Sequence, residues 1–306
     1  MNFKRNKDIR DIKNELPENL IHNISAMIFA GFSPDYLKHF FLNISSDQIL
    51  YCIYSSLMSK QDEILELLKE SNEIFNICSQ YCIANNYKRI YFYHIQKTGG
   101  SSLLRSFVNL STNVQIRKIT RHPRKRIISN GYIYQGWVLP LLEKGDYFFG
   151  YSHLPAHSLR LPDKTFKITI LRDPVKRIVS QYKELYQIKQ EGLQNYFLKY
   201  MGNSFRDFFL SLPEHKLMSQ LYMFSPVMNI HEAFDNIVSL NHYFFTEEYQ
   251  IGLDRLSQKL KIDLPYIHDR KAPSNPDILE SEIDELREKL YLEYILFDKL
   301  FNYSKF

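Results

Sequence analysis

The chain has little cysteine, a single tryptophan and no long hydrophobic run. Its three cysteines, Cys52, Cys78 and Cys82, are too few and odd in number to make a disulfide framework, which favours a reducing compartment. Cys78 and Cys82 stand four residues apart, but no second Cys/His pair follows at metal-ligand spacing. We therefore expect buried thiols on one helix face and no metal site.

Apolar runs long enough to cross a membrane are also missing, since a span needs about 18 or more such residues. The best stretch, LIHNISAMIFAGF, is interrupted by His, Asn and Ser, and the opening MNFKRNKDIRDIKNE is too charged for a signal peptide. These absences predict a protein with no membrane span and a cytoplasmic location.

The composition is that of a folded protein. Hydrophobic residues make up 44% of the 306 residues and charged residues 24%, which excludes wholesale disorder. The formal net charge of +5 permits anionic ligands, but it is far below a typical nucleic-acid footprint. The length suits one large domain or a core with a smaller appendage.

Two kinds of periodicity divide the chain near residue 87. Residues 19–86 follow a helical pattern, with a capped start at Ser33-Pro34-Asp35. Short β-favouring runs then alternate with helical patterns, and the strands are expected at 88–95, 147–151, 167–171 and 242–246. The order predicts an α/β fold: a three-layer, P-loop-like core with a central parallel sheet over 87–306, and an all-helical N-terminal section over 1–86. A final apolar stripe from Ile283 to Phe301 predicts one last helix.

The segment HIQKTGGSS, residues 94–102, stands between an expected strand and an expected helix. Its glycine pair lets the backbone approach an anion, and the N–H groups of Ser101, Ser102 and Leu103 are expected to point at it. Lys97 adds positive potential. The segment is not a Walker A loop, because the lysine precedes the glycines. An ordinary glycine-rich turn is the alternative, but it would not need a lysine and three hydroxyl residues.

A second segment, LRDPVKRIVS, covers residues 171–180. Arg172 is expected where a strand ends, Asp173 can cap a helix, and Pro174 suits its first position. Ser180 then lies about two turns into that helix. Arg172 and Ser180 could grip a second phosphate. Taken alone, the segment is better explained as a capped helix with a surface arginine.

Together and in this order, HIQKTGGSS and LRDPxxRxxS resemble motifs of the sulfotransferases that use 3′-phosphoadenosine-5′-phosphosulfate (PAPS). The match is closest to the carbohydrate branch, which includes the heparan sulfate 2-O-sulfotransferases and their bacterial relatives. The resemblance runs from about residue 88 to about 190, with a weaker echo to 275 through FFTEEYQIGLDRL. Gln96 replaces the usual proline and Ser101 the usual threonine, and both departures spare the lysine and the glycines.

The resemblance implies roles for the donor-binding residues. Lys97 would sit beside the 5′-phosphosulfate, and Thr98, Gly99, Gly100, Ser101 and Ser102 would bind that phosphate. Arg172 and Ser180 would hold the 3′-phosphate. Arg270 and Lys271, in the late segment HDRKAPSN, would be further 3′-phosphate contacts. PAPS is thus the expected donor, and no metal is required.

The resemblance also implies a general base close before the second motif, and a histidine suits proton abstraction at neutral pH. His153 in FGYSHLP fits, with Ser152 where glycine is more usual, and His157 is the reserve. Glu143 and Glu184 compete with it, because other sulfotransferase branches use a glutamate.

The acceptor is less well defined. Residues 117–126 hold six Lys/Arg and no acid, followed closely by Tyr132, Tyr134 and Trp137. The stretch is a solvated loop, a contact for an acidic acceptor, or a weak nucleic-acid contact. By analogy with the branch, we expect a glycan or glycolipid acceptor. The net charge of +5 leads us to expect no nucleic-acid partner.

Two other functions remain open from the sequence. One is a P-loop-like nucleotide or small-molecule kinase, against which the position of Lys97 counts. The other is a non-catalytic anion-binding protein, for which the departures at Gln96 and Ser152 are the best support.

Overall fold

A computed structural model of the chain describes residues 86–110, 127–129, 132–136, 142–143, 145, 147–193, 195–267 and 276–304. The predicted helical section 1–86 lies outside these residues apart from Asn86. The basic stretch 117–126, Trp137, and the pair Arg270 and Lys271 also lie outside them.

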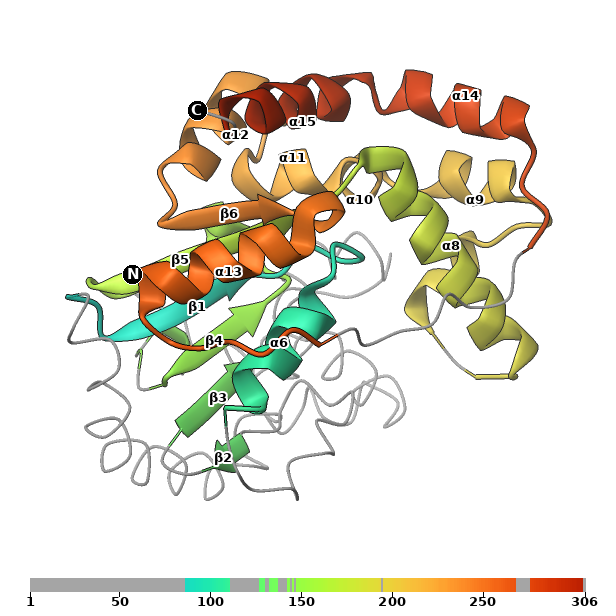
Figure 1. Cartoon of the computed structure of the whole chain (residues 1–306). Helices are drawn as coiled ribbons and strands as arrows, with labels where there is room; N and C mark the ends of the chain where they lie inside the picture. The colour runs from blue at the N-terminus through green and yellow to red at the C-terminus, as the bar shows by residue number, and fades with distance from the viewer. Residues whose placement is uncertain are drawn as a thin grey trace, which may run out of the picture.

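One six-stranded sheet organises the described residues, with strand order β2-β3-β4-β1-β5-β6 (Figure 1). All neighbouring pairs are parallel except β2 and β3, which are antiparallel. The strands are β1 (Arg89–Tyr93), β2 (Ile127–Ser129), β3 (Tyr132–Gly136), β4 (Phe149–Ser152), β5 (Thr165–Leu171) and β6 (His242–Phe245). The four predicted strands are therefore present, and the predicted parallel core is confirmed. The prediction missed β2 and β3.

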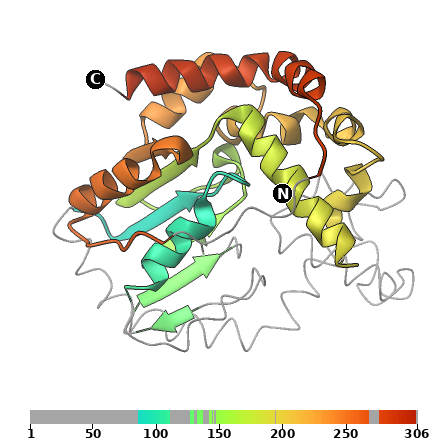
Figure 2. The same cartoon turned by 45° about the vertical axis from the view of Figure 1, so that its right-hand side comes forward.

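Helices cover both faces of the sheet. Helices α6 (Gly100–Val108) and α13 (Tyr249–Leu260) lie side by side on one face in both views (Figures 1 and 2). Against the other face pack α8 (Pro174–Gln190), α11 (Ser219–Phe224), α12 (Ile230–Val238) and α15 (Tyr291–Tyr303). The remaining elements are α9 (Phe205–Ser211), α10 (Glu214–Leu217), α14 (Glu280–Lys289), η2 (Ala156–Ser158), η3 (Tyr196–Tyr200) and η4 (Thr246–Glu248). None of the described helices is long and apolar enough to cross a membrane.

The alternation of side chains along the strands builds a separate core on each face. Ile90 and Phe92 of β1 point into the core beneath α6 and α13. Tyr91 and Tyr93 belong to the core that α8, α11, α12 and α15 close. Strands buried on both faces are typical of a parallel sheet between two helical layers, and the predicted three-layer arrangement is confirmed.

The predicted single C-terminal helix is in fact two helices. Helix α14 ends at Lys289 and α15 begins at Tyr291, with the fully buried Leu290 between them at φ −92°, ψ 12°. The apolar spacing continues through this break without a proline or glycine. Periodicity alone therefore could not reveal it.

The parallel strands bring distant segments to one edge. The residues that follow β1, β4, β5 and β6 are His94, His153, Arg172 and Thr246. In open α/β sheets, ligands bind beyond the carboxyl ends of the strands. Arg89 marks the opposite end of β1, where its Nε donates to the carbonyl oxygen of Gly145 over 2.7 Å.

Candidate functional site

The loop between β1 and α6 depends on its two glycines. Gly99 caps α6 at φ +87°, a conformation that L side chains rarely adopt. A Cβ atom at Gly100 would lie 2.2 Å from the ring of His94. Lys97 itself has φ +69°. The loop is therefore a specific, partly strained conformation held by its surroundings.

Two of the three amide donors predicted at the start of α6 are used within the helix. The N–H groups of Ser102 and Leu103 both donate to the carbonyl oxygen of Gly99, over 3.0 and 3.4 Å. They close the first turn and do not point at a ligand, because α6 begins at Gly100, one residue before the predicted start. The amides of the first turn that precede Ser102 are those of Gly100 and Ser101, and these are the ones placed to bind an anion. The Thr98 hydroxyl is also used internally, since it donates to the carbonyl oxygen of Ile95 over 2.9 Å.

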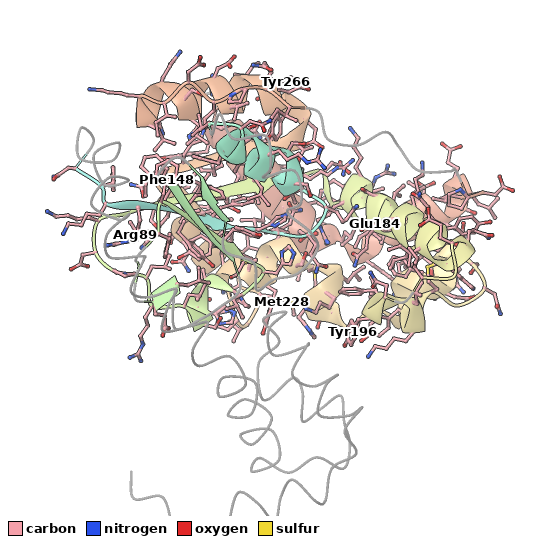
Figure 3. The ribbon with its side chains drawn as sticks, turned by 90° about the horizontal axis from the view of Figure 1, so that it is seen from below. Arg89, Phe148, Glu184, Tyr196, Met228 and Tyr266 are labelled. Carbon is pink, nitrogen blue, oxygen red and sulfur yellow. The ribbon has the colours of Figure 1, made fainter. Side chains whose placement is uncertain are left out.

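Lys97 meets one of the candidate bases. Its Nζ lies 3.2 Å from Oε2 of Glu184 on α8, and the two side chains are 15% and 31% exposed. Figure 3 shows Glu184 and Arg89 toward opposite ends of the sheet, with Glu184 on the side of the glycine loop. The ammonium and the carboxylate thus lie together beside the loop, where solvent can still reach them.

Arg172 joins the second motif to the first. Its Nη1 donates to the carbonyl oxygen of Lys97 over 2.9 Å. Its Nε is buried and has no hydrogen-bond partner among the described residues, although buried polar groups normally have one. Its backbone is held by Gln220, whose amide group pairs with the N–H and C=O of Arg172 at 2.8 Å each. The structure therefore brings the two predicted segments together.

Helix α8 presents two faces to different neighbours. Ser180 and Glu184 are four residues apart, so they share a face, and that face reaches Lys97. Arg177 points into the core instead: it is 1% exposed and pairs with the equally buried Glu293 at 3.2 Å. Of the two motif arginines, Arg172 faces the loop and Arg177 stabilises the fold.

His153 follows β4 and contacts the start of the glycine loop. Its Nδ1 is hydrogen-bonded to the carbonyl oxygen of His94, and the two rings lie 4.3 Å apart. Burial lowers the pKa of His153 to about 4, and the nearby charge of Lys216 acts in the same direction. The imidazole is therefore neutral at pH 7. Because a carbonyl oxygen only accepts, Nδ1 carries the proton and Nε2 the lone pair.

The other candidate bases make different contacts. His157, in η2, packs its ring edge-on against Tyr222 at 5.3 Å. Glu143 accepts a hydrogen bond from the Arg160 amide over 3.4 Å. Among the predicted bases, only His153 and Glu184 are placed against the loop by the contacts of the described residues.

Ser152, a departure from the resembled motif, is accommodated on the core side. It is buried, its hydroxyl pairs with the Tyr91 hydroxyl at 2.6 Å, and it accepts from the Leu154 amide over 3.1 Å. Its side chain therefore does not enter the site, and this departure does not count against a catalytic function.

Sequence reasoning missed Gln220 and Thr246 as site residues. Nothing in the segment MSQLYMF indicates that the Gln220 side chain would bind the backbone of Arg172, the residue after β5. Thr246 did carry a signal, because it directly follows a strand of the parallel sheet. Its hydroxyl lies 2.7 Å from the carbonyl oxygen of Thr98 and 3.0 Å from that of Leu171.

Comparison with known families agrees with this geometry. Residues 79–227, 149 of the 306, match the model of the sulfotransferase family. The matched stretch contains both the glycine loop and the Arg172 segment. The match supports the sulfotransferase superfamily and sulfuryl transfer in general. No curated protein matches the chain. In the part of the chain that the structure describes, no group of three His, Cys, Asp or Glu side chains could hold a metal ion.

Proposed function

We propose that the protein is a PAPS-dependent sulfotransferase that transfers a sulfuryl group to a hydroxyl of a carbohydrate-type acceptor. The main support for the proposal is the hydrogen bond from Arg172 to the Lys97 carbonyl, because it joins the two segments that we propose to bind the phosphates of the donor. Both segments fall inside the residues that match the sulfotransferase family.

Donor binding divides between the two segments. At the 5′ side, the Gly100 and Ser101 amides follow the left-handed Gly99 at the start of α6, and the Lys97 ammonium lies beside Glu184. At the 3′ side, the buried Nε of Arg172 would find the acceptor that it lacks among the described residues, and Ser180 of α8 is proposed as a second contact. Arg270 and Lys271 are proposed as further 3′-phosphate contacts.

The proposed reaction needs a base, a nucleophile and stabilisation of a leaving group. His153 Nε2 takes the proton of the acceptor hydroxyl, and the acceptor oxygen bonds to sulfur. The bond between sulfur and the 5′-phosphate oxygen breaks, and 3′-phosphoadenosine-5′-phosphate departs. Lys97 and the loop amides face the charge that develops on that phosphate. The His94 carbonyl keeps His153 in the required tautomer.

The carbohydrate nature of the acceptor rests on the resemblance to the carbohydrate branch. We propose the basic stretch 117–126, with Tyr132, Tyr134 and Trp137, as its contact surface, which favours an acidic glycan or glycolipid. No nucleic-acid partner is proposed.

Calorimetric titration with 3′-phosphoadenosine-5′-phosphate tests the site. We expect micromolar binding to the wild type and a loss of about tenfold or more, about 1.4 kcal/mol, in Lys97→Ala and Arg172→Ala. Matched controls are Lys189→Ala, an exposed lysine of α8, and Arg206→Ala, whose guanidinium pairs with Glu285 at the surface. Both controls should bind as the wild type does.

The alternatives predict other outcomes. No binding of 3′-phosphoadenosine-5′-phosphate, together with saturable binding of ATP and Mg²⁺, would contradict the proposal and favour a kinase. Tight binding without turnover of PAPS on any glycan would favour the non-catalytic protein. Turnover that disappears in His153→Ala supports the whole proposal.

A further inference from the structure

We propose that Thr246 is a positioning residue: its hydroxyl holds the glycine loop and the Arg172 segment at the separation that donor binding requires. The donor itself rests on the proposed function above. The bonds of Thr246 do not, because they join two segments of the chain whatever the ligand is.

The sheet brings Thr246 to this place. Strand β6 runs parallel to β5, with Phe245 aligned to Leu171. Thr246 and Arg172 are therefore the next residues along neighbouring strands, at the same edge. One turn of 3₁₀ helix, η4, starts at Thr246 and turns the chain into α13.

The hydroxyl contacts the peptide groups next to the two phosphate-binding residues. Its oxygen lies 2.7 Å from the Thr98 carbonyl, one residue beyond Lys97, and 3.0 Å from the Leu171 carbonyl, one residue before Arg172. A hydroxyl carries one proton, so the two carbonyls share a single donor. Its loss would weaken the hold on both segments at once.

Packing and charge from the same turn add to this hold. The Thr246 methyl group and the Tyr249 ring lie 3.6 and 3.5 Å from the Cβ position of Gly99, so they back the left-handed residue of the loop. Glu247 Oε1 accepts from the Asp173 amide over 3.0 Å, directly after Arg172. The turn after β6 thus supports both segments.

Strain in the loop gives this support a functional consequence. Lys97 and Gly99 adopt φ values of +69° and +87°, which persist only where the surroundings fix them. If the hydroxyl is lost, the loop samples more conformations. Part of the binding free energy is then used to order the loop, so the affinity for the ligand falls. One net hydrogen bond corresponds to a loss of about tenfold.

The test compares Thr246→Val, Thr246→Ser and the matched control Thr165→Val. The Thr165 hydroxyl also donates to a carbonyl oxygen, that of Pro162 over 2.6 Å, but it lies at the other end of β5. We expect Thr246→Val to lose about tenfold in affinity for 3′-phosphoadenosine-5′-phosphate. The serine variant should recover most of the loss, and Thr165→Val should bind normally even if its melting temperature falls.

Amide hydrogen exchange without ligand separates this inference from the proposed function. Thr246→Val should speed exchange in residues 98–103 and 172–173, and Thr165→Val should not. Faster exchange in Thr246→Val, together with no binding of 3′-phosphoadenosine-5′-phosphate by the wild type, would support the positioning role and contradict the proposed donor. Unchanged exchange in both segments, equal loss of affinity in the two valine variants, or no rescue by serine would overturn the inference.

Discussion

Nη1 of Arg172 donates a hydrogen bond to the carbonyl oxygen of Lys97 over 2.9 Å, so the residue expected at the 3′-phosphate also holds the residue expected at the 5′-phosphosulfate. The Nε atom of the same guanidinium group is buried and has no hydrogen-bond partner among the described residues. A planar guanidinium can serve a carbonyl oxygen and a phosphate at the same time. With the proposed phosphate bound, this double use would give Arg172 a role that charge alone does not explain.

Arg172→Lys should therefore behave like Arg172→Ala. A lysine keeps the charge but has no planar fork, so it cannot bind the carbonyl and the phosphate in this geometry. We expect a loss of about tenfold or more in affinity for 3′-phosphoadenosine-5′-phosphate by calorimetry. Arg206→Lys, at a surface ion pair of α9, is the control. Affinity within twofold of the wild type in Arg172→Lys would show that only the charge matters.

Gly100→Ala tests the packing behind the loop. The added methyl group would lie 2.2 Å from the His94 ring, which is itself stacked on Phe92 and next to His153. We expect a destabilisation of about 1 to 3 kcal/mol in urea unfolding, and a loss of sulfuryl transfer because His153 is displaced. The control is Gly192→Ala, at φ +66° with open space around it, which carries only backbone strain of about 1 to 2 kcal/mol. Unchanged transfer in Gly100→Ala would show that the packing of His94 does not affect His153, the proposed base.

The sequence predicted the elements that carry strong local signals. The glycine pair and the proline after Asp173 lie at the predicted helix starts to within one residue, and the predicted apolar runs form β1, β4, β5 and β6 with strand ends shifted by up to two residues. The individual hydrogen bonds between segments far apart in the chain were not predictable, although the place of Thr246 directly after a strand was a signal. Gln220 binds the backbone of Arg172, and Thr246 bridges two carbonyls, but neither residue type has a preference that reveals such partners. The one-residue error at the start of α6 arose because Gly100 can serve as a first helical residue as well as a loop residue.

His153 and Glu184 are distinguished by their variants. If His153 is the base, His153→Ala should lower kcat by about 10² to 10⁴ with little change in affinity for 3′-phosphoadenosine-5′-phosphate. Glu184→Gln should keep kcat within about tenfold. It should also bind the anion at least as tightly, because it removes the carboxylate 3.2 Å from the Lys97 ammonium. The reverse pattern of kcat losses would assign the base to Glu184.

The acid limb of kcat/KM follows from the environment of His153. The pKa of this imidazole is lowered from 6.5 to about 4, mainly because the ring is buried; the bond to the His94 carbonyl raises it, and the Lys216 charge adds to the lowering. A base must be unprotonated to act, so kcat/KM should persist as the pH falls through 6.5 and decline only toward pH 4. Lys216→Met removes a positive charge and should move the limb upward. A wild-type limb at pH 6.5 would contradict this environment.

The buried pair of Arg177 and Glu293 links stability to the site. Both side chains are 1% exposed at a separation of 3.2 Å, and the second oxygen of Glu293 accepts from the backbone N–H of Gln220 over 2.7 Å. Glu293→Ala leaves a buried guanidinium without its counter-charge, for which we expect a loss of about 3 to 5 kcal/mol in the free energy of unfolding.

The matched control for Glu293→Ala is Asp284→Ala, which breaks an exposed pair with Arg287 at 2.7 Å and should cost about 0 to 1 kcal/mol. The double variant Arg177→Met/Glu293→Leu should recover much of the stability, because it removes both buried charges. The double variant still lacks the carboxylate that accepts from the backbone N–H of Gln220. The side chain of Gln220 in turn binds the backbone of Arg172. Its affinity for 3′-phosphoadenosine-5′-phosphate should therefore stay reduced at restored stability. Full recovery of both would mean that the pair stabilises the fold without positioning Arg172.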